Sequence, residues 1–177
     1  MSKKIRPSLS DTRPVSTRQV AILWRLLTGA TQDTIARELK LSLRTIENDV
    51  AELRRKLSAR TRYTLGAASV RWGYVAAAAI RELVRERAGI RNWQPPTRRQ
   101  HVIIIRMSGG RSYAQLAEEL GVSVRTVRRD LQQLITANGA VDLVTAGALF
   151  EALGWHRDTP QSPLGHFLVD GGSASAG

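Results

Sequence analysis

The stretch TQDTIARELKLSLRTIENDV at residues 31–50 recurs in altered form as SYAQLAEELGVSVRTVRRDL at residues 112–131. The two stretches align without a gap at an offset of 81 residues, and this register continues from Ser16–Tyr74 onto Thr97–Trp155. Self-similarity at one fixed register indicates a duplicated structural unit. The identical pairs include Arg18/Arg99, Gly29/Gly110, Ala36/Ala117, Ser42/Ser123, Arg44/Arg125, Thr45/Thr126, Asp49/Asp130, Gly66/Gly147 and Gly73/Gly154.

Each copy is predicted to contain four helices. Ser16 and Thr97 are hydroxyl residues with a Gln three positions later, which is a capping box at the start of helix one. We expect helix two over residues 32–39 and 113–120, and helix four near residues 63–74 and 141–153. Helix three follows Ser42 and Ser123, which are good N-cap residues. Its apolar residues recur at helical spacing, so we expect these side chains to face the core: Leu43, Ile46, Val50, Leu53 and Leu57, then Val124, Val127, Leu131 and Leu134.

The turn between helices two and three needs a residue in the left-handed conformation. The second copy has Gly121 there, whereas the first copy has Lys40. A residue with a Cβ atom is destabilised in this conformation by about 1 kcal/mol. We therefore expect the first motif to be the less regular of the two.

The fold class predicted from these patterns is all-α, with two tandem tetrahelical helix-turn-helix domains at residues 16–74 and 97–157. Residues 75–96 form a helix and linker between them, in which Gly89 ends the helix and Pro95 and Pro96 prevent its resumption. The helix near residues 76–87 either extends helix four or stands alone. Residues 1–15 are expected to be a flexible basic arm, either solvated or lying in a minor groove, and residues 158–177 a disordered tail.

The composition indicates a polyanionic partner. The chain has 27 Lys and Arg residues against 15 Asp and Glu residues, a net charge of +12. Such an excess favours salt-dependent binding to nucleic acid. The chain has no cysteine and no apolar run of membrane-spanning length. We expect a cytoplasmic, nucleoid-associated protein without a membrane partner.

Both copies resemble the LuxR/FixJ-type helix-turn-helix domain. In the first copy the resemblance rests on Ile35-Ala-Arg-Glu-Leu39, Ser42-Leu-Arg-Thr-Ile46 and Leu53-Arg-Arg-Lys-Leu57. In the second copy it rests on the continuous run from Leu116 to Val127. The segment Arg128-Arg-Asp-Leu131 is also similar to the recognition helix of DeoR-like repressors.

The resemblance implies that helix three enters the major groove of DNA. The base-contacting positions then fall on Glu47, Asn48 and Ala51 in the first copy, where Glu47 also repels phosphates. In the second copy they fall on Arg128, Arg129 and Gln132, side chains that pair well with guanine and adenine. The candidate phosphate anchors are Arg44, Thr45, Arg125 and Thr126, with Arg55 on the same outward face.

These expectations favour a sequence-specific transcription regulator that reads two half-sites of double-stranded DNA with the two recognition helices of one chain. The alternatives are an architectural or recombination-accessory DNA-binding protein, or a sigma-like adaptor in which one copy contacts protein, including RNA polymerase. Helix four is a dimer surface in the resembling family. This helix has an apolar stripe formed by Leu65, Ala68, Trp72, Val75 and Ala79. The stripe either forms a homodimer, as the 75–88 helix also could, or pairs with residues 146–153 of the same chain.

Catalysis and metal binding find no support in the sequence. The three histidines, His101, His156 and His166, lack metal-ligand spacing, and we expect no enzyme activity, catalytic residue, cofactor or metal. Asp49 and Asp130 occupy one repeat position, and we expect each to form an internal ion pair or cap, with Arg25 and Arg106 as candidate partners. The four tryptophans, Trp24, Trp72, Trp93 and Trp155, are expected to pack in the core or an interface.

Overall fold

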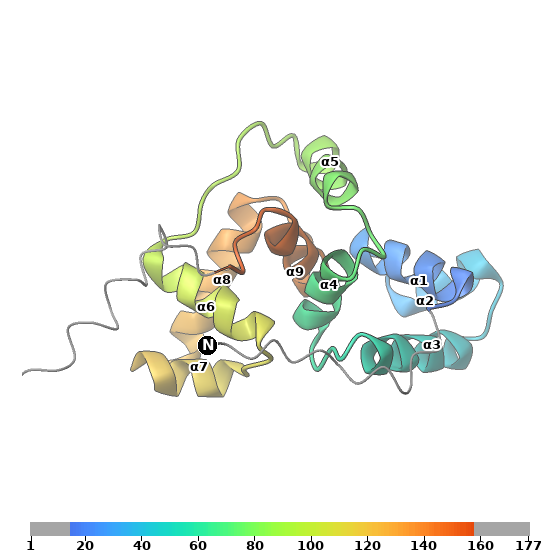
Figure 1. Cartoon of the computed structure of the whole chain (residues 1–177), viewed down its shortest axis with the longest axis horizontal. Helices are drawn as coiled ribbons and strands as arrows, with labels where there is room; N and C mark the ends of the chain where they lie inside the picture. Colours follow the sequence, from blue (N-terminus) through green and yellow to red (C-terminus); the bar gives the residue numbers. More distant parts are fainter. Residues whose placement is uncertain (1–14, 158–177) are drawn as a thin grey trace, which may run out of the picture.

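The computed structural model describes residues 15–157, a part of the chain that is helical and contains no strand. The predicted all-α class with two helix-turn-helix domains is confirmed (Figure 1). The helices of the first copy are α1 (Thr17–Leu27), α2 (Gln32–Leu39), α3 (Leu43–Lys56) and α4 (Arg62–Arg71). Those of the second copy are α6 (Arg98–Ser108), α7 (Tyr113–Leu120), α8 (Val124–Ala137) and α9 (Leu143–Ala152), each shifted by the same 81 residues. The additional helix α5 (Ala77–Ala88) lies between the copies.

The helix starts and turns follow the chemistry expected from the sequence. Both capping boxes form, with the Ser16 and Thr97 hydroxyls accepting from the backbone N–H three residues later. Lys40 does adopt the left-handed conformation, at φ 53°, and its counterpart Gly121 has φ 63°. The duplicated turn geometry is therefore kept even where the first copy has a side chain that disfavours it.

The core side chains of helix three lie inward with one exception. Ile46 and Leu53 are fully buried, as are the equivalent residues of the second copy, Val127 and Leu134, to within 2%. The prediction was wrong for Leu43, whose surface is 41% exposed. Leu43 is the first residue of α3 and extends past the end of the core, so helical periodicity alone misplaced it.

Two of the four tryptophans lie outside the core, and for them the predicted interface packing stays a prediction. Trp24 is 37% exposed and Trp72 is 52% exposed, so neither is a core residue. Trp93 and Trp155 are partly buried, as expected. The Arg85 guanidinium lies 5.7 Å from the centre of the Trp93 ring, and Trp155 packs against Phe150 with ring centroids 5.3 Å apart.

The two copies are joined through their fourth helices, which lie side by side in the middle of the molecule (Figure 1). The helices approach so closely at Gly66 that a Cβ atom there would be 1.8 Å from the Val144 carbonyl oxygen. A Cβ atom at Gly147 would be 2.0 Å from the Tyr63 carbonyl oxygen. Tyr63 and Val144 are themselves equivalent positions of the repeat, so the contact is reciprocal, as in a two-fold symmetric dimer interface.

The remaining contacts between the copies have the same symmetry. Helix α1 contacts α9, and correspondingly α6 contacts α4. Gly29 lies against Val141, and the equivalent Gly110 lies against the side chain of Arg60. The intramolecular alternative for helix four is the arrangement observed, and a homodimer through this face would have to displace α9. The chain is thus folded as a covalent pseudo-dimer.

Helix α5 departs from this symmetry. It is a separate helix rather than an extension of α4, and its Ile80 and Val84 side chains are fully buried. It packs on α9, and Arg81 donates a hydrogen bond to the Ala152 carbonyl oxygen at 3.1 Å. At its other end Arg87 donates to the Thr28 carbonyl oxygen at 2.7 Å. The helix therefore connects both copies.

The expectations for the basic arm and the tail concern residues 1–14 and 158–177, which lie outside the described residues. Within residues 15–157, no helix has both the length and the apolar character needed to cross a bilayer.

Candidate nucleic-acid interface

The second and third helices of each copy form the helix-turn-helix, and the start of the third helix is built alike in both. The Ser42 hydroxyl accepts a hydrogen bond from the Thr45 backbone N–H at 3.1 Å and lies 2.8 Å from the Thr45 hydroxyl. Ser123 and Thr126 repeat this pair, at 3.1 Å and 2.9 Å. Both threonines, predicted as phosphate anchors, are partly buried and already help to cap their helix.

The other predicted residues of the first copy share one outward face of α3. All of them are exposed: Arg44, Glu47, Asn48, Ala51 and Arg55. Arg44 and Glu47 have no ion-pair partner within residues 15–157, so their charges face solvent there. The structure brings these side chains together on one helix surface, where the acidic Glu47 is surrounded by neutral and basic neighbours.

The predicted residues of the second copy form the corresponding face of α8, and it is more basic. Arg125, Arg128, Arg129 and Gln132 are all exposed. The Arg128 guanidinium lies 5.4 Å from the centre of the Tyr113 ring, a cation–π contact that restrains it. Burial raises the pKa of the Tyr113 hydroxyl, which therefore stays neutral beside that cation. The face thus presents three Arg side chains, one of them held in place by α7.

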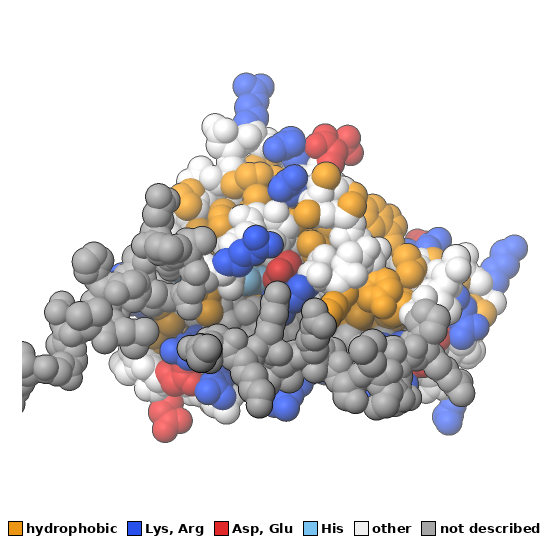
Figure 2. Space-filling model, in the orientation of Figure 1, with side chains coloured by type: hydrophobic (Ala, Val, Ile, Leu, Met, Phe, Trp, Pro, Cys, Tyr) orange, Lys and Arg blue, Asp and Glu red, His pale blue; other side chains and the backbone are white. Residues whose placement is uncertain are grey.

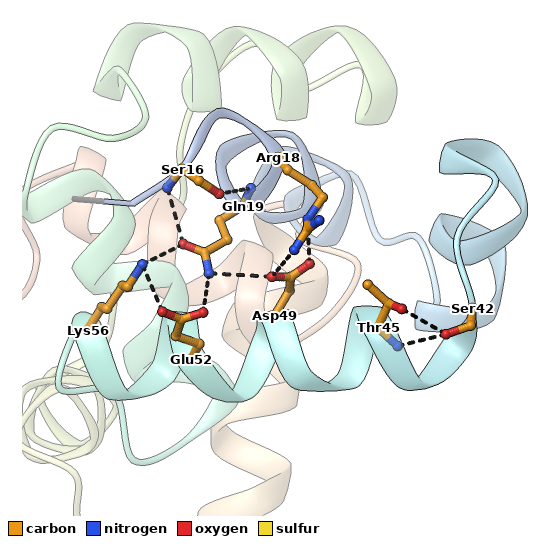
Figure 3. A network of polar contacts seen from close by, with 8 residues as sticks. All are labelled: Ser16, Arg18, Gln19, Ser42, Thr45, Asp49, Glu52 and Lys56. Atoms are coloured by element: carbon orange, nitrogen blue, oxygen red, sulfur yellow. Dashed lines mark hydrogen bonds and ion pairs between the residues drawn. The ribbon is translucent and has the colours of Figure 1, made fainter. Parts of the chain in front are cut away.

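Each recognition helix is fixed to the first helix of its copy by a buried carboxylate. In the first copy the Arg18 guanidinium contacts both carboxylate oxygens of Asp49, at 2.8 Å and 3.1 Å (Figure 3). Asp49 is 4% exposed, so the pairing provides the counter-charge that a buried carboxylate needs. The hydrogen bond to Asp49 raises the pKa of Arg18.

The second copy has the same ion pair between Arg99 and Asp130. The prediction of an internal ion pair at Asp49 and Asp130 is confirmed, but the predicted partners were wrong. Arg25 and Arg106 instead pair with Glu38 and Glu119 on the second helix. The N-terminal end of the first helix, not its C-terminal end, crosses the middle of helix three.

In the first copy this clamp extends into a larger polar network, drawn in Figure 3. The Gln19 amide donates to the Glu52 carboxylate at 2.8 Å and accepts from the Lys56 ammonium at 2.9 Å. Lys56 also pairs with Glu52 at 3.1 Å, and its hydrogen bond lowers the pKa of that carboxyl group. The equivalents of Glu52 and Lys56 are Gln133 and Ala137, so the second copy lacks this Glu–Lys pair, and its Gln100 amide donates instead to the Asp130 carbonyl oxygen at 3.0 Å.

The structure adds two arginines, Arg54 and Arg60, to the predicted set and places them beside the predicted Arg55. Arg54, Arg55 and Arg60 line a shallow groove of about 440 Å³ next to Ala51 at the end of α3. Arg54 is held there by hydrogen bonds to the Ala59 and Arg60 carbonyl oxygens. Arg54 could have been found from the Arg-Arg-Lys run of the sequence. No local pattern predicts that Arg60, after the turn that follows α3, lines the same groove.

A second groove of about 730 Å³ lies beside α8 and reaches the boundary between the copies. Its walls include Arg128, Arg129 and Gln132 from the recognition helix, together with Arg62 from α4. Arg62 donates to the Asp142 carboxylate at 2.7 Å, and so connects the two copies at this point. Figure 2 shows Lys and Arg side chains near α7 at one end of the visible face and around α3 at the other.

A buried polar chain on the other side of the interface also connects the two copies. The Tyr63 hydroxyl lies 2.5 Å from His156 Nε2, and His156 Nδ1 lies 2.7 Å from the Glu151 carboxylate. Burial raises the pKa of Glu151, but the hydrogen bonds from His156 and Arg71 outweigh it and lower this pKa to about 2. Burial lowers the pKa of His156, so the ring is neutral, donates to Glu151 and accepts from Tyr63. This chain helps to fix the relative position of the recognition helices.

Comparison with known proteins agrees with this geometry. Residues 13–66 match a family model described as bacterial regulatory proteins, luxR family. Residues 97–157 match a family model described as a helix-turn-helix (HTH) domain. No curated protein and no solved structure matches the chain. The chain thus carries two helix-turn-helix domains of the DNA-binding kind, the first of which is similar to luxR-family bacterial regulators.

Proposed function

We propose that this protein is a sequence-specific transcription regulator that binds double-stranded DNA with α3 and α8 in two successive half-sites. The observation that carries the proposal is the reciprocal α4–α9 contact, in which Gly66 and Gly147 occupy equivalent positions. A two-fold arrangement of two recognition helices matches the two-fold symmetry of the duplex backbone. One chain then provides what a homodimer provides in other helix-turn-helix regulators.

The symmetry supports a specific form of the binding site. Two-fold related recognition helices read half-sites in inverted orientation, with centres about one helical turn, or ~34 Å, apart. The two halves differ in sequence because the reading faces differ. Arg128, Arg129 and Gln132 favour guanine and adenine contacts, whereas Glu47 and Asn48 favour cytosine and adenine. The similarity of Arg128-Arg-Asp-Leu131 to DeoR-like repressors fits a base-reading role for α8.

The test is to select bound fragments from a random genomic library at about 150 mM salt and sequence them. The expected motif has two unequal halves in inverted orientation. Direct repeats, or strong salt-sensitive retention without a motif, would refute this form of the proposal, and the second result would favour an architectural protein.

Point substitutions assign each half-site to its helix. Arg129→Ala should relax the preference in one half only, and Asn48→Ala should relax it in the other, each weakening binding by about 1–3 kcal/mol. Arg91→Ala is the matched control, because it removes one exposed cation from the linker. If Arg129→Ala and Arg91→Ala weaken binding equally on all sequences, α8 does not read bases.

Glu47 on the exposed face of α3 favours one other role, in which the first copy contacts a protein such as RNA polymerase and only the second copy binds DNA. Removal of the first copy is a poor test, because α9 packs against both α4 and α5 and would be left uncovered. Asn48→Ala with Ala51→Arg keeps the packing intact. Unchanged DNA affinity and an unchanged motif would support the protein-contact role.

A further inference from the structure

The pseudo-symmetry of the two copies creates two equivalent grooves. Helix α5 fills one of them, and no described residue fills the other. Helix α5 lies in a seat with three walls, formed by α9, the α8–α9 turn and the C-terminal end of α1. Its Arg81 bonds to Ala152 on the first wall, and its Arg87 bonds to Thr28 on the third. On the second wall, Ala88 lies where a Cβ atom on Gly139 would come within 2.3 Å.

The equivalent walls on the other side of the molecule enclose a groove of about 560 Å³. They are formed by α4, the α3–α4 turn and the C-terminal end of α6. Its lining residues are the repeat counterparts of the seat: Ser58 for Gly139, Arg71 for Ala152, Trp72 for Leu153, Gly109 for Thr28 and Gly110 for Gly29. No described residue of the chain fills this groove as α5 fills the seat.

The absence of a covering helix over this groove, within the described part of the chain, accounts for the high exposure of Trp72. Trp72 is 52% exposed, whereas its counterpart Leu153 is partly buried against the core. Ala68, which also lines the groove, stands where the seat has the fully buried Leu149. The smaller side chain leaves room above α4. The groove is lined by polar as well as apolar residues, and the exposed Trp72 indole is its main apolar surface, which is the kind of surface that binds a hydrophobic segment.

The chain itself passes this groove at the end of the described region. Arg71, one of the lining residues, binds the Glu151 carboxylate at 2.6 Å, and Glu151 binds His156. The last described residues of the chain therefore lie close to Arg71, a lining residue of the groove. The segment that follows them, residues 158–177, contains four apolar residues close together, Leu164, Phe167, Leu168 and Val169.

We propose that the segment Leu164–Val169 of the same chain binds in the groove between α4 and the C-terminal end of α6. The segment cannot bind as α5 does. A Cβ atom is present at Ser58 where α5 needs Gly139, and residues 158–177 contain no Arg or Lys to reach the Arg71 and Gly109 carbonyl groups. Apolar contact with Trp72 must provide the binding, and the small side chain of Ala68, which is only 6% exposed, leaves space beside it for the Phe167 ring. A short tether raises the effective concentration of such a segment to the millimolar range.

The proposal does not depend on DNA binding, and its test uses none. The indole N–H signal of Trp72 is followed by NMR in the full chain and in a chain that ends at Arg157, after assignment with Trp72→Phe. Shortening the chain should shift this signal and increase quenching of Trp72 by acrylamide. Leu164→Ser with Leu168→Ser should reproduce both changes, while Ser173→Ala, a control in the same segment, should leave them as in the full chain.

A peptide of residues 158–177, added to the shortened chain, should return the Trp72 signal towards its position in the full chain at millimolar concentration. Urea unfolding of the shortened chain verifies that the helices are intact. An identical Trp72 signal and identical quenching in the full and shortened chains would refute the proposal. Protection of Trp72 that depends on protein concentration would also refute it, because the occupant would then be a second copy.

Discussion

The close contact between α4 and α9 makes a strong prediction about Gly66 and Gly147. A Cβ atom at Gly66 would lie 1.8 Å from the Val144 carbonyl oxygen, whereas ordinary contacts begin at 3.4 Å. At Gly147 the corresponding atom is the Tyr63 carbonyl oxygen, 2.0 Å away. Both oxygens belong to the backbone of a packed helix, so they cannot move aside like the end of a flexible side chain. Gly66→Ala therefore forces the helices apart by roughly 1.5 Å, because close-packed interiors have no space to absorb the methyl group.

The magnitude follows from two opposing terms. Overpacking costs about 1–3 kcal/mol, and the upper end applies because the separation affects contacts along the whole interface. Replacing glycine by alanine within a helix stabilises the folded state by about 1 kcal/mol, because alanine has the higher helix propensity. We expect Gly66→Ala and Gly147→Ala each to lower the free energy of unfolding by about 2 kcal/mol. The double variant should lose less than the sum, since helices already separated accommodate the second methyl group at lower cost.

Urea unfolding followed by circular dichroism measures these changes. Gly109→Ala is the matched control, because a Cβ atom there meets only the Arg106 carbonyl oxygen, at 3.3 Å. Splitting of the unfolding curve into two transitions would also agree with the reasoning, since each copy has its own core. A loss below 0.5 kcal/mol for both variants, about the size of a neutral surface substitution, would refute the close packing of these helices.

Three further predictions concern single side chains. Lys40→Gly should stabilise the protein by about 1 kcal/mol in urea unfolding, since Lys40 is held at φ 53°, and an equal gain with Lys40→Ala would contradict this explanation. Arg99→Met should destabilise by about 3 kcal/mol because it leaves the buried Asp130 carboxylate with only the more distant Arg129, at 3.7 Å, whereas Arg125→Met should be neutral in the same assay. The folded-state pKa values of His156 and Glu151 both lie below their ordinary values, so the unfolded chain takes up protons first as the pH falls. The free energy of unfolding should therefore decrease as the pH falls below 6.5, and again from 4.5 towards 2. His156→Asn should remove the first decrease and only reduce the second, because Arg71 still lowers the pKa of Glu151.

The repeat, the helices and their caps could be predicted from the sequence because they depend on short-range chemistry. A hydroxyl cap, a Gln three residues later and apolar residues at helical spacing act within one helix, so the bounds of α2 and α7 follow directly from the residue pattern. Even the strained turn at Lys40 was predictable, because the second copy has glycine at the same position.

Contacts between helices were decided only by the tertiary structure. The sequence shows that Asp49 and Asp130 are equivalent, but the crossing of the first and third helices selects Arg18 and Arg99 as their partners. Likewise, an apolar fourth helix suits a homodimer and an intramolecular pair equally well. The choice depends on whether one chain can bring Gly66 onto Val144 and Gly147 onto Tyr63 at the same time, and this requires the linker to fold α5 back over α9. Local propensity acts over a few residues, whereas this geometry joins positions about 80 residues apart, so no local pattern contains it.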